Sequence, residues 1–360
     1  MKKFTSIYLQ APYLIFIGDV DSTTYGKTGL GIVQWRPELV AGQLRFQGNN
    51  LDLGVPDMTI QQAVEAGVKS VVIGVAPVGG VIDKHWIGIL EEAAAAGMDV
   101  ISGLHRPLEE YAAVAEAAKA SGARLINVRV PADNLPIGNG IKRSGRRVLM
   151  VGTDCAVGKK YTALALTKSL HERNLNATFR ATGQTGIMIA GNGIPIDAVI
   201  SDFVAGAAEE VSPENDADHW DVIEGQGSLF HPAYAGVSLG LLHGSQADAI
   251  VVCHDASRQT ISSCPHIAIP TADECMALNL RCGSLTNPDI ICVGISINTS
   301  GLPEEERASY KQQLSETTGL PCVDSVLDGC EAIVEYMQSH FCIGVDKNNA
   351  SVKTKEQNHA

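Results

Sequence analysis

Short apolar runs separated by amphipathic segments recur along most of this chain. In the first 130 residues, apolar runs that predict buried strands lie at residues 13–18, 70–74, 99–102 and 125–129. Segments with helical periodicity lie between them, at residues 59–66, 83–96 and 108–120. The runs Gly31–Trp35 and Val40–Phe46 predict a small hairpin. Strands that alternate with helices indicate βαβ units, so we expect a parallel sheet.

The same alternation resumes after a stretch rich in Pro, Gly and Asn at residues 131–145, which predicts a linker. Strands are predicted at residues 148–151, 177–180, 221–224, 249–253 and 290–295. Helices are predicted at residues 163–170, 303–319 and 328–339. We therefore expect an α/β protein with an N-terminal Rossmann-like domain (1–135), a C-terminal P-loop NTPase-like parallel-sheet domain (136–345) and a disordered polar tail (346–360).

Composition excludes several classes of protein. The formal net charge of −13 over 360 residues argues against general nucleic-acid binding and against attachment to a membrane surface. No apolar run is long enough for a membrane span, and the N-terminal segment does not resemble a signal peptide. The nine cysteines form no Cys-x-x-Cys pair, so we expect neither a disulfide framework nor a metal site. A cytoplasmic protein fits these features.

The strongest chemical signal follows the apolar run at residues 147–151. It is a glycine-flanked loop that leads into a helix and carries a lysine, the layout of a phosphate-binding loop. We expect its residues to bind phosphates of a cofactor: Gly152, Thr153, Asp154, Cys155, Ala156, Val157, Gly158, Lys159, Lys160, Tyr161 and Thr162. The spacing between the two glycines resembles that of dethiobiotin synthetase-like loops. The alternative is a strand–turn–helix joint with glycines for close packing.

Polar residues follow two other predicted strands. Gln184 and Thr185 lie between two glycines after one strand, and Glu224 and Gln226 come at the end of another. His231 follows shortly after. The carboxyl ends of parallel strands face the ligand crevice, so Glu224 is the first candidate for a general base and His231 the second. The alternatives are a glycine turn with polar filler, an acid that caps a turn, and a loop histidine.

The first domain offers weaker candidates. His105 follows a predicted strand, Arg129 ends another, and Arg180 ends a strand of the second domain. His105 is the next candidate for a catalytic group if neither Glu224 nor His231 serves. For each of these residues, a structural role is as good an interpretation as a functional one.

Several motifs together resemble one family, the DgcN family, which was long a domain of unknown function. They are Gly74–Gly80, Ser102–His105, Gly152–Lys159, Ala181–Met188, Asp202–Gly206 and Glu224–Leu229 with Phe230, His231 and Pro232. The resemblance covers about residues 13 to 300. It implies a Rossmann-like domain, a phosphate-loop domain, and a D-glutamate N-acetyltransferase that uses acetyl-CoA and supplies its product to a partner racemase. One departure is Lys160-Tyr161, where the family usually has Met-Thr.

The resemblance predicts transfer of an acetyl group from acetyl-CoA to the amine of an acidic amino acid. A dicarboxylic acceptor requires cations, and the candidates are Arg129, Arg180 and Lys160. Gln184, Thr185 and Gln226 are further candidates for substrate binding. The alternative is an ATP-dependent ligase or kinase of dethiobiotin synthetase type, in which Lys159 and Thr162 hold phosphates and Mg²⁺ and Glu224 or Asp154 helps to hold the metal. We expect a homo-oligomer with a small-molecule substrate.

Overall fold

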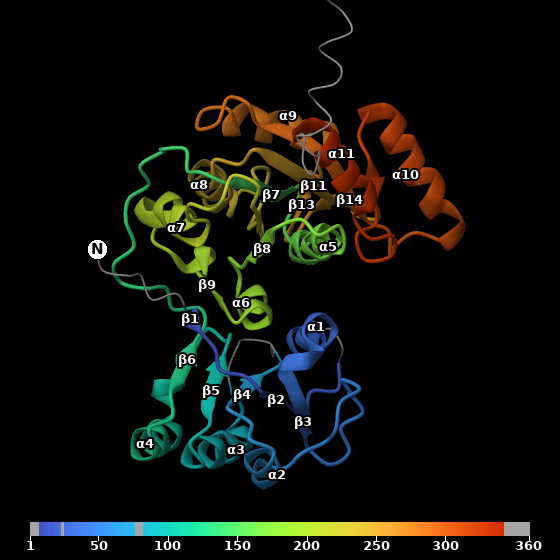
Figure 1. Cartoon of the computed structure of the whole chain (residues 1–360). Coiled ribbons are helices and arrows are strands. Elements are labelled where there is room, and N and C mark those ends of the chain that lie inside the picture. Colours follow the sequence, from blue (N-terminus) through green and yellow to red (C-terminus); the bar gives the residue numbers. More distant parts are fainter. Residues whose placement is uncertain (1–6, 23–24, 76–81, 342–360) are drawn as a thin grey trace, which may run out of the picture. The chain divides into compact units, whose positions relative to one another are not determined.

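The computed structural model describes residues 7–22, 25–75 and 82–341, which form two compact units (Figure 1). The first unit comprises Met1–Pro136 and Ala181–Phe203, and the second comprises Ile137–Arg180 and Val204–Ala360. The division expected from the sequence is contiguous, whereas here the segment Ala181–Phe203 packs with the N-terminal residues. The predicted tail, residues 346–360, lies outside the described residues.

The first unit is built on a parallel sheet, as the alternating pattern predicts. Its strands, in spatial order, are β3 (Val40–Arg45), β2 (Tyr13–Gly18), β4 (Ser70–Ile73), β5 (Asp99–Ser102) and β6 (Leu125–Asn127). Every neighbouring pair is parallel. All side chains of β2, β4 and β5 are buried, which explains why these strands read as continuous apolar runs. The carboxyl ends of all five strands meet at one edge of the sheet.

The helices of this unit are α1 (Lys27–Trp35), α2 (Ile60–Glu65), α3 (Lys84–Ala95), α4 (Ala112–Ser121) and α6 (Gln184–Ala190). α3 packs against α2 and α4, whereas α1 packs against α6 and β2 (Figure 1). The predicted helix start near residue 59 is confirmed by a capping box, in which Thr59 and Gln62 satisfy each other's backbone N–H groups.

The hairpin predicted from Gly31–Trp35 and Val40–Phe46 is wrong. Residues 27–35 form helix α1, and β3 pairs in parallel with β2. The glycines of this helix permit close packing on the sheet. A Cβ at Gly29 would lie 3.0 Å from Ile15 Cγ2, and the Gly29 N–H donates to the Gly74 carbonyl at 2.7 Å. Small buried residues of this kind mask the helical period in the sequence.

The second unit contains a larger parallel sheet. Its spatial order is β15 (Cys322–Val323), β14 (Ile291–Asn298), β11 (Ala249–Asp255), β7 (Arg146–Gly152), β10 (Trp220–Ile223) and β8 (Ala177–Arg180). Each pairing is parallel. The five strands predicted for this half of the chain are therefore confirmed. β7, which leads into the glycine-flanked loop, lies between β11 and β10.

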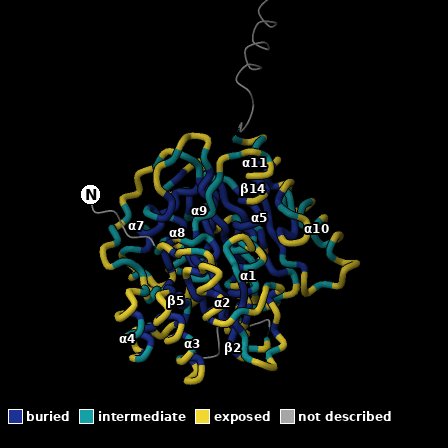
Figure 2. The backbone as a smooth tube through the Cα atoms, turned by 60° about the horizontal axis from the view of Figure 1, so that its bottom comes forward, coloured by how far each residue is buried: buried dark blue, intermediate teal, exposed yellow. Residues whose placement is uncertain are grey.

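The helices of this unit are α5 (Lys159–Glu172), α7 (Val204–Val211), α8 (Ala235–Ser245), α9 (Ala272–Gly283), α10 (Glu304–Thr318) and α11 (Glu331–Phe341). α5 packs with α11, whereas α8 packs between α7 and α9 (Figure 1). α10 buries none of its residues, and Figure 2 shows it as the exposed helix at the margin of this unit. In the described part of the chain, no helix combines the length and hydropathy needed to cross a bilayer.

Candidate active site

The loop between β7 and α5 has the backbone of an anion-binding site. Gly158, the N-cap of α5, has φ +108°, and Ala156 has φ +54°, an uncommon conformation for a residue with a Cβ. Alternating backbone handedness turns successive N–H groups toward one point, where an anion is held. As a glycine, this N-cap residue offers no side chain to the first-turn N–H groups of α5. The loop therefore has the form that binds phosphate at a helix N-terminus.

Lys159 supplies a buried positive charge at this loop. Its side chain is buried, and its Nζ donates a hydrogen bond to the Asp154 carbonyl at 2.8 Å. Burial lowers the pKa of Lys159, because removal from water disfavours the ammonium. Among the described residues, no carboxylate forms an ion pair with it at the distances that define one. A bound anion would supply that missing negative charge.

The predicted position of Glu224 next to the loop strand agrees with the strand pairing. β10 runs parallel to β7, with Ile223 opposite Leu149, so the chain leaves β10 at Glu224 on the edge where the loop begins. The carboxylate is buried. The next residue must be glycine: a Cβ at Gly225 would lie 1.6 Å from the Met150 carbonyl oxygen and 2.9 Å from Lys159 Cδ. This close approach holds Glu224 at the base of the loop.

Arg258 is a site residue that sequence reasoning missed. It follows β11, and its Nη1 donates to an Asp154 carboxylate oxygen at 2.7 Å and to the Cys155 carbonyl at 2.6 Å. The Ser262 N–H donates to the same carboxylate oxygen, and the Cys155 N–H donates to the other. In the sequence, Arg258 is marked only as a positively charged residue shortly after a buried strand. No glycine motif surrounds it to indicate a site. Arg258 thus fixes the conformation of the loop from a neighbouring strand.

We expect Arg258→Gln to destabilise the protein and weaken cofactor binding together. The substitution leaves the fully buried Asp154 carboxylate without its cation, and breaking a buried pair typically costs about 3 kcal/mol or more. The remaining N–H contacts to Asp154 place the effect at the low end of that range. Thermal unfolding and calorimetric titration measure the two effects. Arg173→Gln, which breaks an exposed pair with Glu335, is the control and should change neither. Unchanged stability in Arg258→Gln would contradict this role.

His231 lies beside the loop but has both ring nitrogens engaged. Its Nδ1 accepts from the Ala233 N–H at 3.1 Å, so Nε2 carries the proton and donates to the Ser262 carbonyl at 3.1 Å. Asp154, Cys155 and His231 place potential metal ligands within 4.8 Å of one another. However, the histidine lone pair and both Asp154 oxygens already accept hydrogen bonds. The arrangement suits neither a metal ion nor a histidine base.

The other predicted residues of the loop and of the first turn of α5 have different surroundings. The Thr162 hydroxyl donates to Ser296 Oγ at 2.8 Å inside the core, away from the loop backbone, which differs from its predicted role as a ligand. The Thr153 hydroxyl lies 3.1 Å from His254 Nδ1. Lys160 Nζ stands 4.4 Å from the centre of the Tyr161 ring. Burial raises the pKa of the Cys155 thiol, so the thiol stays protonated.

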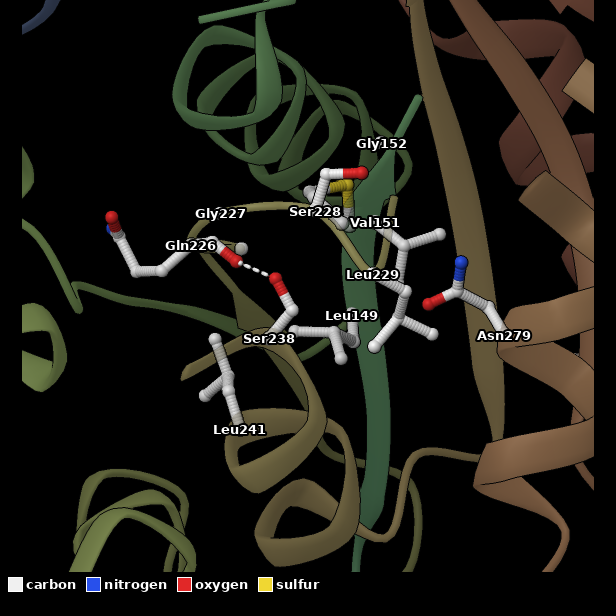
Figure 3. A pocket seen from close by; sticks show the side chains of 12 residues that line it. Leu149, Val151, Gly152, Gln226, Gly227, Ser228, Leu229, Ser238, Leu241 and Asn279 are labelled. Atoms are coloured by element: carbon white, nitrogen blue, oxygen red, sulfur yellow. Dashed lines mark hydrogen bonds between the residues drawn. The ribbon is translucent and has the colours of Figure 1, made fainter. Parts of the chain in front are cut away.

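Gln226 lies in the loop after Gly225, where its carbonyl accepts a hydrogen bond from Ser238 at 2.7 Å (Figure 3). The cavity drawn there has a volume of about 10 Å³, enough for one water molecule at most. It is therefore not the ligand site. Arg180 points elsewhere: its Nε donates to the buried Asp221 carboxylate at 2.7 Å, which favours a structural role over the predicted contact with substrate.

The remaining predicted residues lie in the first unit. Arg129 and His105 line one pocket at the carboxyl ends of β6 and β5. Gln184 opens helix α6 rather than lying in a glycine turn, and its Oε1 accepts from Arg129 Nε at 2.6 Å. Thr185 Oγ1 lies 3.3 Å from Thr28 Oγ1. The structure therefore brings one group of predicted residues together at the loop of the second unit and another, Arg129, His105 and Gln184, at the pocket of the first; Arg180 and Thr185 belong to neither group.

Comparison with known proteins gives one family for both units. Residues 136–334 match a domain of unknown function described as the DUF1611 P-loop domain, and residues 44–131 match its Rossmann-like N-terminal domain. A crystal structure of a DUF1611 family protein from Anabaena variabilis is 32% identical with a TM-score of 0.80, covering 92% of this chain and all of that one. The chain therefore belongs to the DUF1611 family, with a Rossmann-like and a P-loop domain.

Two relatives of known activity are similar over almost their whole length. A protein from a Pseudoalteromonas species and one from Tritonibacter scottomollicae are each 45% identical to this chain. Each alignment covers 91% of this chain and 98% of the relative. Both relatives are named D-glutamate N-acetyltransferase. The resemblance drawn from the sequence motifs is thereby confirmed at the level of the family.

Proposed function

We propose that this protein is an N-acetyltransferase that moves an acetyl group from acetyl-CoA to the amine of D-glutamate. The observation that carries the proposal is the pair of relatives named for this activity, which are 45% identical over 91% of the chain. The loop geometry supports it independently, because coenzyme A carries a pyrophosphate and a 3′-phosphate. A helix N-terminus with a buried ammonium binds such anions without hydrolysing them.

In the proposed reaction, the amine nitrogen of the acceptor attacks the thioester carbonyl carbon of acetyl-CoA. An amide C–N bond forms, the C–S bond breaks, and coenzyme A leaves as its thiol. The amine is protonated at neutral pH, so a base must remove a proton before attack. We assign this role to Glu224, because its carboxylate is buried at the end of β10, next to the strand that leads into the loop.

The alternative, an ATP-dependent ligase or kinase, requires oxygen ligands for Mg²⁺ near the phosphates. Of the three candidate ligands, Thr162, Asp154 and Glu224, the first two are occupied. The Thr162 hydroxyl bonds Ser296, and the Asp154 carboxylate accepts from Arg258, Ser262 and Cys155. Calorimetric titration separates the two functions. We expect acetyl-CoA to bind and Mg-ATP to bind at least tenfold more weakly; the reverse order of affinities would favour the alternative.

We expect chelation of metal ions to leave the activity intact. In the proposed reaction a carboxylate removes the proton, and backbone N–H groups of the loop bind the cofactor phosphates. None of its steps requires a divalent cation. The measurement is the rate of coenzyme A release with and without excess EDTA. An ATP-dependent enzyme would lose activity under chelation because its nucleotide is bound as the magnesium complex. Loss of acetyl transfer on chelation, restored by Mg²⁺ or Zn²⁺, would refute the metal-free mechanism.

A cytoplasmic location and a homo-oligomeric state are also proposals. The described cysteines are all free thiols, which agrees with a reducing compartment. Fractionation and light scattering, respectively, test the two.

A further inference from the structure

The first unit contains a pocket of about 280 Å³ that the loop chemistry does not use. It is lined by residues that follow β5 and β6, among them His105 and Arg129, and by Asp197 and Ala198 from the segment after α6. The carboxyl edge of a parallel sheet is where such folds bind ligands. The volume lies just below the range of about 300–1,000 Å³ typical for drug-sized ligands, so it suits an amino acid.

Arg129 is held in a fixed position in this pocket. Its Nε donates to Gln184 Oε1 at 2.6 Å and to the Gly103 carbonyl at 3.0 Å. Its Nη1 donates to Asp197 at 3.1 Å. Gly103 makes this arrangement possible, because a Cβ there would lie 3.0 Å from Gln184 Oε1. A side chain held from three directions has already lost the rotamer freedom that ligand binding would otherwise cost.

The guanidinium keeps donors for a ligand. It has more N–H groups than these contacts use, and within the described part of the first unit no hydrogen bond of Nη2 is seen. Arg129 is 24% exposed and Asp197 34% exposed, so both remain accessible from the pocket. An arginine that is oriented by neighbouring acceptors and open on one edge matches the planar geometry of a carboxylate.

We propose that this pocket binds the side-chain carboxylate of the acyl acceptor, with Arg129 as the specificity-determining residue and Gln184 and Asp197 as its positioning residues. The proposal rests on the function proposed above and names the substrate subsite within it. The apolar side of the pocket, which includes Leu104 and Pro107, suits the methylene carbons of a glutamate side chain.

The test measures kcat and KM for the acceptor in Arg129→Gln and in the unaltered enzyme, both at saturating acetyl-CoA. We expect the KM for D-glutamate to rise by about 10–100-fold, the cost of losing a charge-assisted contact, while acetyl-CoA affinity stays within about twofold. The preference for D-glutamate over D-glutamine should collapse, because glutamine lacks the second carboxylate. A merely structural role for Arg129 would not change this preference.

Two variants keep the outcome interpretable. Arg124→Gln breaks the ion pair of Arg124 with Asp99, which joins β5 and β6 at their other ends, and should leave the KM unchanged. Asp197→Asn keeps a hydrogen-bond acceptor beside Arg129 but removes a negative charge that repels a bound carboxylate, so the KM should fall. An unchanged KM and unchanged preference in Arg129→Gln would overturn the pocket assignment.

Calorimetric titration of the protein with D-glutamate separates failure of this proposal from failure of the proposed function. Binding that Arg129→Gln abolishes, in a protein that transfers no acetyl group, would refute the function and support the pocket. Acetyl transfer with equal D-glutamate binding in both proteins would support the function and refute the pocket.

Discussion

Glu224→Gln is expected to lower kcat by about 10²–10⁴-fold while acetyl-CoA binding remains nearly unchanged. Glutamine keeps the shape and hydrogen-bonding capacity of the side chain but cannot accept a proton. The carboxylate is buried at the end of β10, and Gly225 behind it contacts the loop strand so closely that the backbone there cannot shift. A loss of rate without a loss of cofactor affinity is the signature of a missing general base.

His231→Gln is the matched comparison, because His231 lies beside the same loop and was the second candidate. Its nitrogens bond the Ala233 N–H and the Ser262 carbonyl, so we expect lower stability but a kcat within about tenfold of the unaltered enzyme. Full activity in Glu224→Gln with inactivity in His231→Gln would transfer the base to His231. Full activity in both would require a base elsewhere, and His105→Ala is then the variant to measure.

Lys159→Ala is expected to weaken acetyl-CoA binding by about 1.5–3 kcal/mol, or roughly 10–150-fold, the usual value of a charge-assisted contact. The ammonium is buried, and its hydrogen bond runs to the Asp154 carbonyl, so a bound phosphate is its natural counter-charge. Burial lowers the pKa of Lys159. The affinity should therefore fall as pH rises through that lowered pKa, because only the ammonium attracts an anion. This fall should be absent in the alanine variant.

The control for Lys159 lies on the same helix. Lys168 is exposed and pairs with Glu172 one turn further along α5, so Lys168→Ala removes the same charge without touching the loop. It should change the affinity by less than about twofold. An acetyl-CoA affinity that is the same in Lys159→Ala as in the unaltered protein would refute the assignment of the loop as the cofactor site.

The parallel sheets were predictable because their strands are buried on both faces. β2 and residues 148–151 of β7 read as uninterrupted apolar runs, and each run ends in a glycine before the next helix. Helix α1 was not predictable, because glycines occupy its buried face where a helix normally shows larger apolar residues. The assignment of residues 181–203 to the first unit has no local signal, since it depends on contacts distant in sequence.

The positions of the loop and of Glu224 were predictable because glycine spacing and strand ends are local features; their roles stay predictions. Arg258 was not, because nothing in its own neighbourhood marks it; only the fold brings it to Asp154. The same holds for Thr162, whose position after the lysine suggested a ligand. The register of α5 instead turns its hydroxyl toward Ser296. The spacing of residues along the chain indicates which side chains could reach a bound phosphate. The packing of helix α5 decides which of them point toward the loop.

The most direct test is product analysis with purified protein, acetyl-CoA and each enantiomer of glutamate. Mass spectrometry should show N-acetylglutamate from D-glutamate, formed in equal amount to the coenzyme A released, with much less product from L-glutamate. Omission of ATP and Mg²⁺ should make no difference. Absence of an acetylated product from either enantiomer, in a protein that binds acetyl-CoA, would contradict the proposed function.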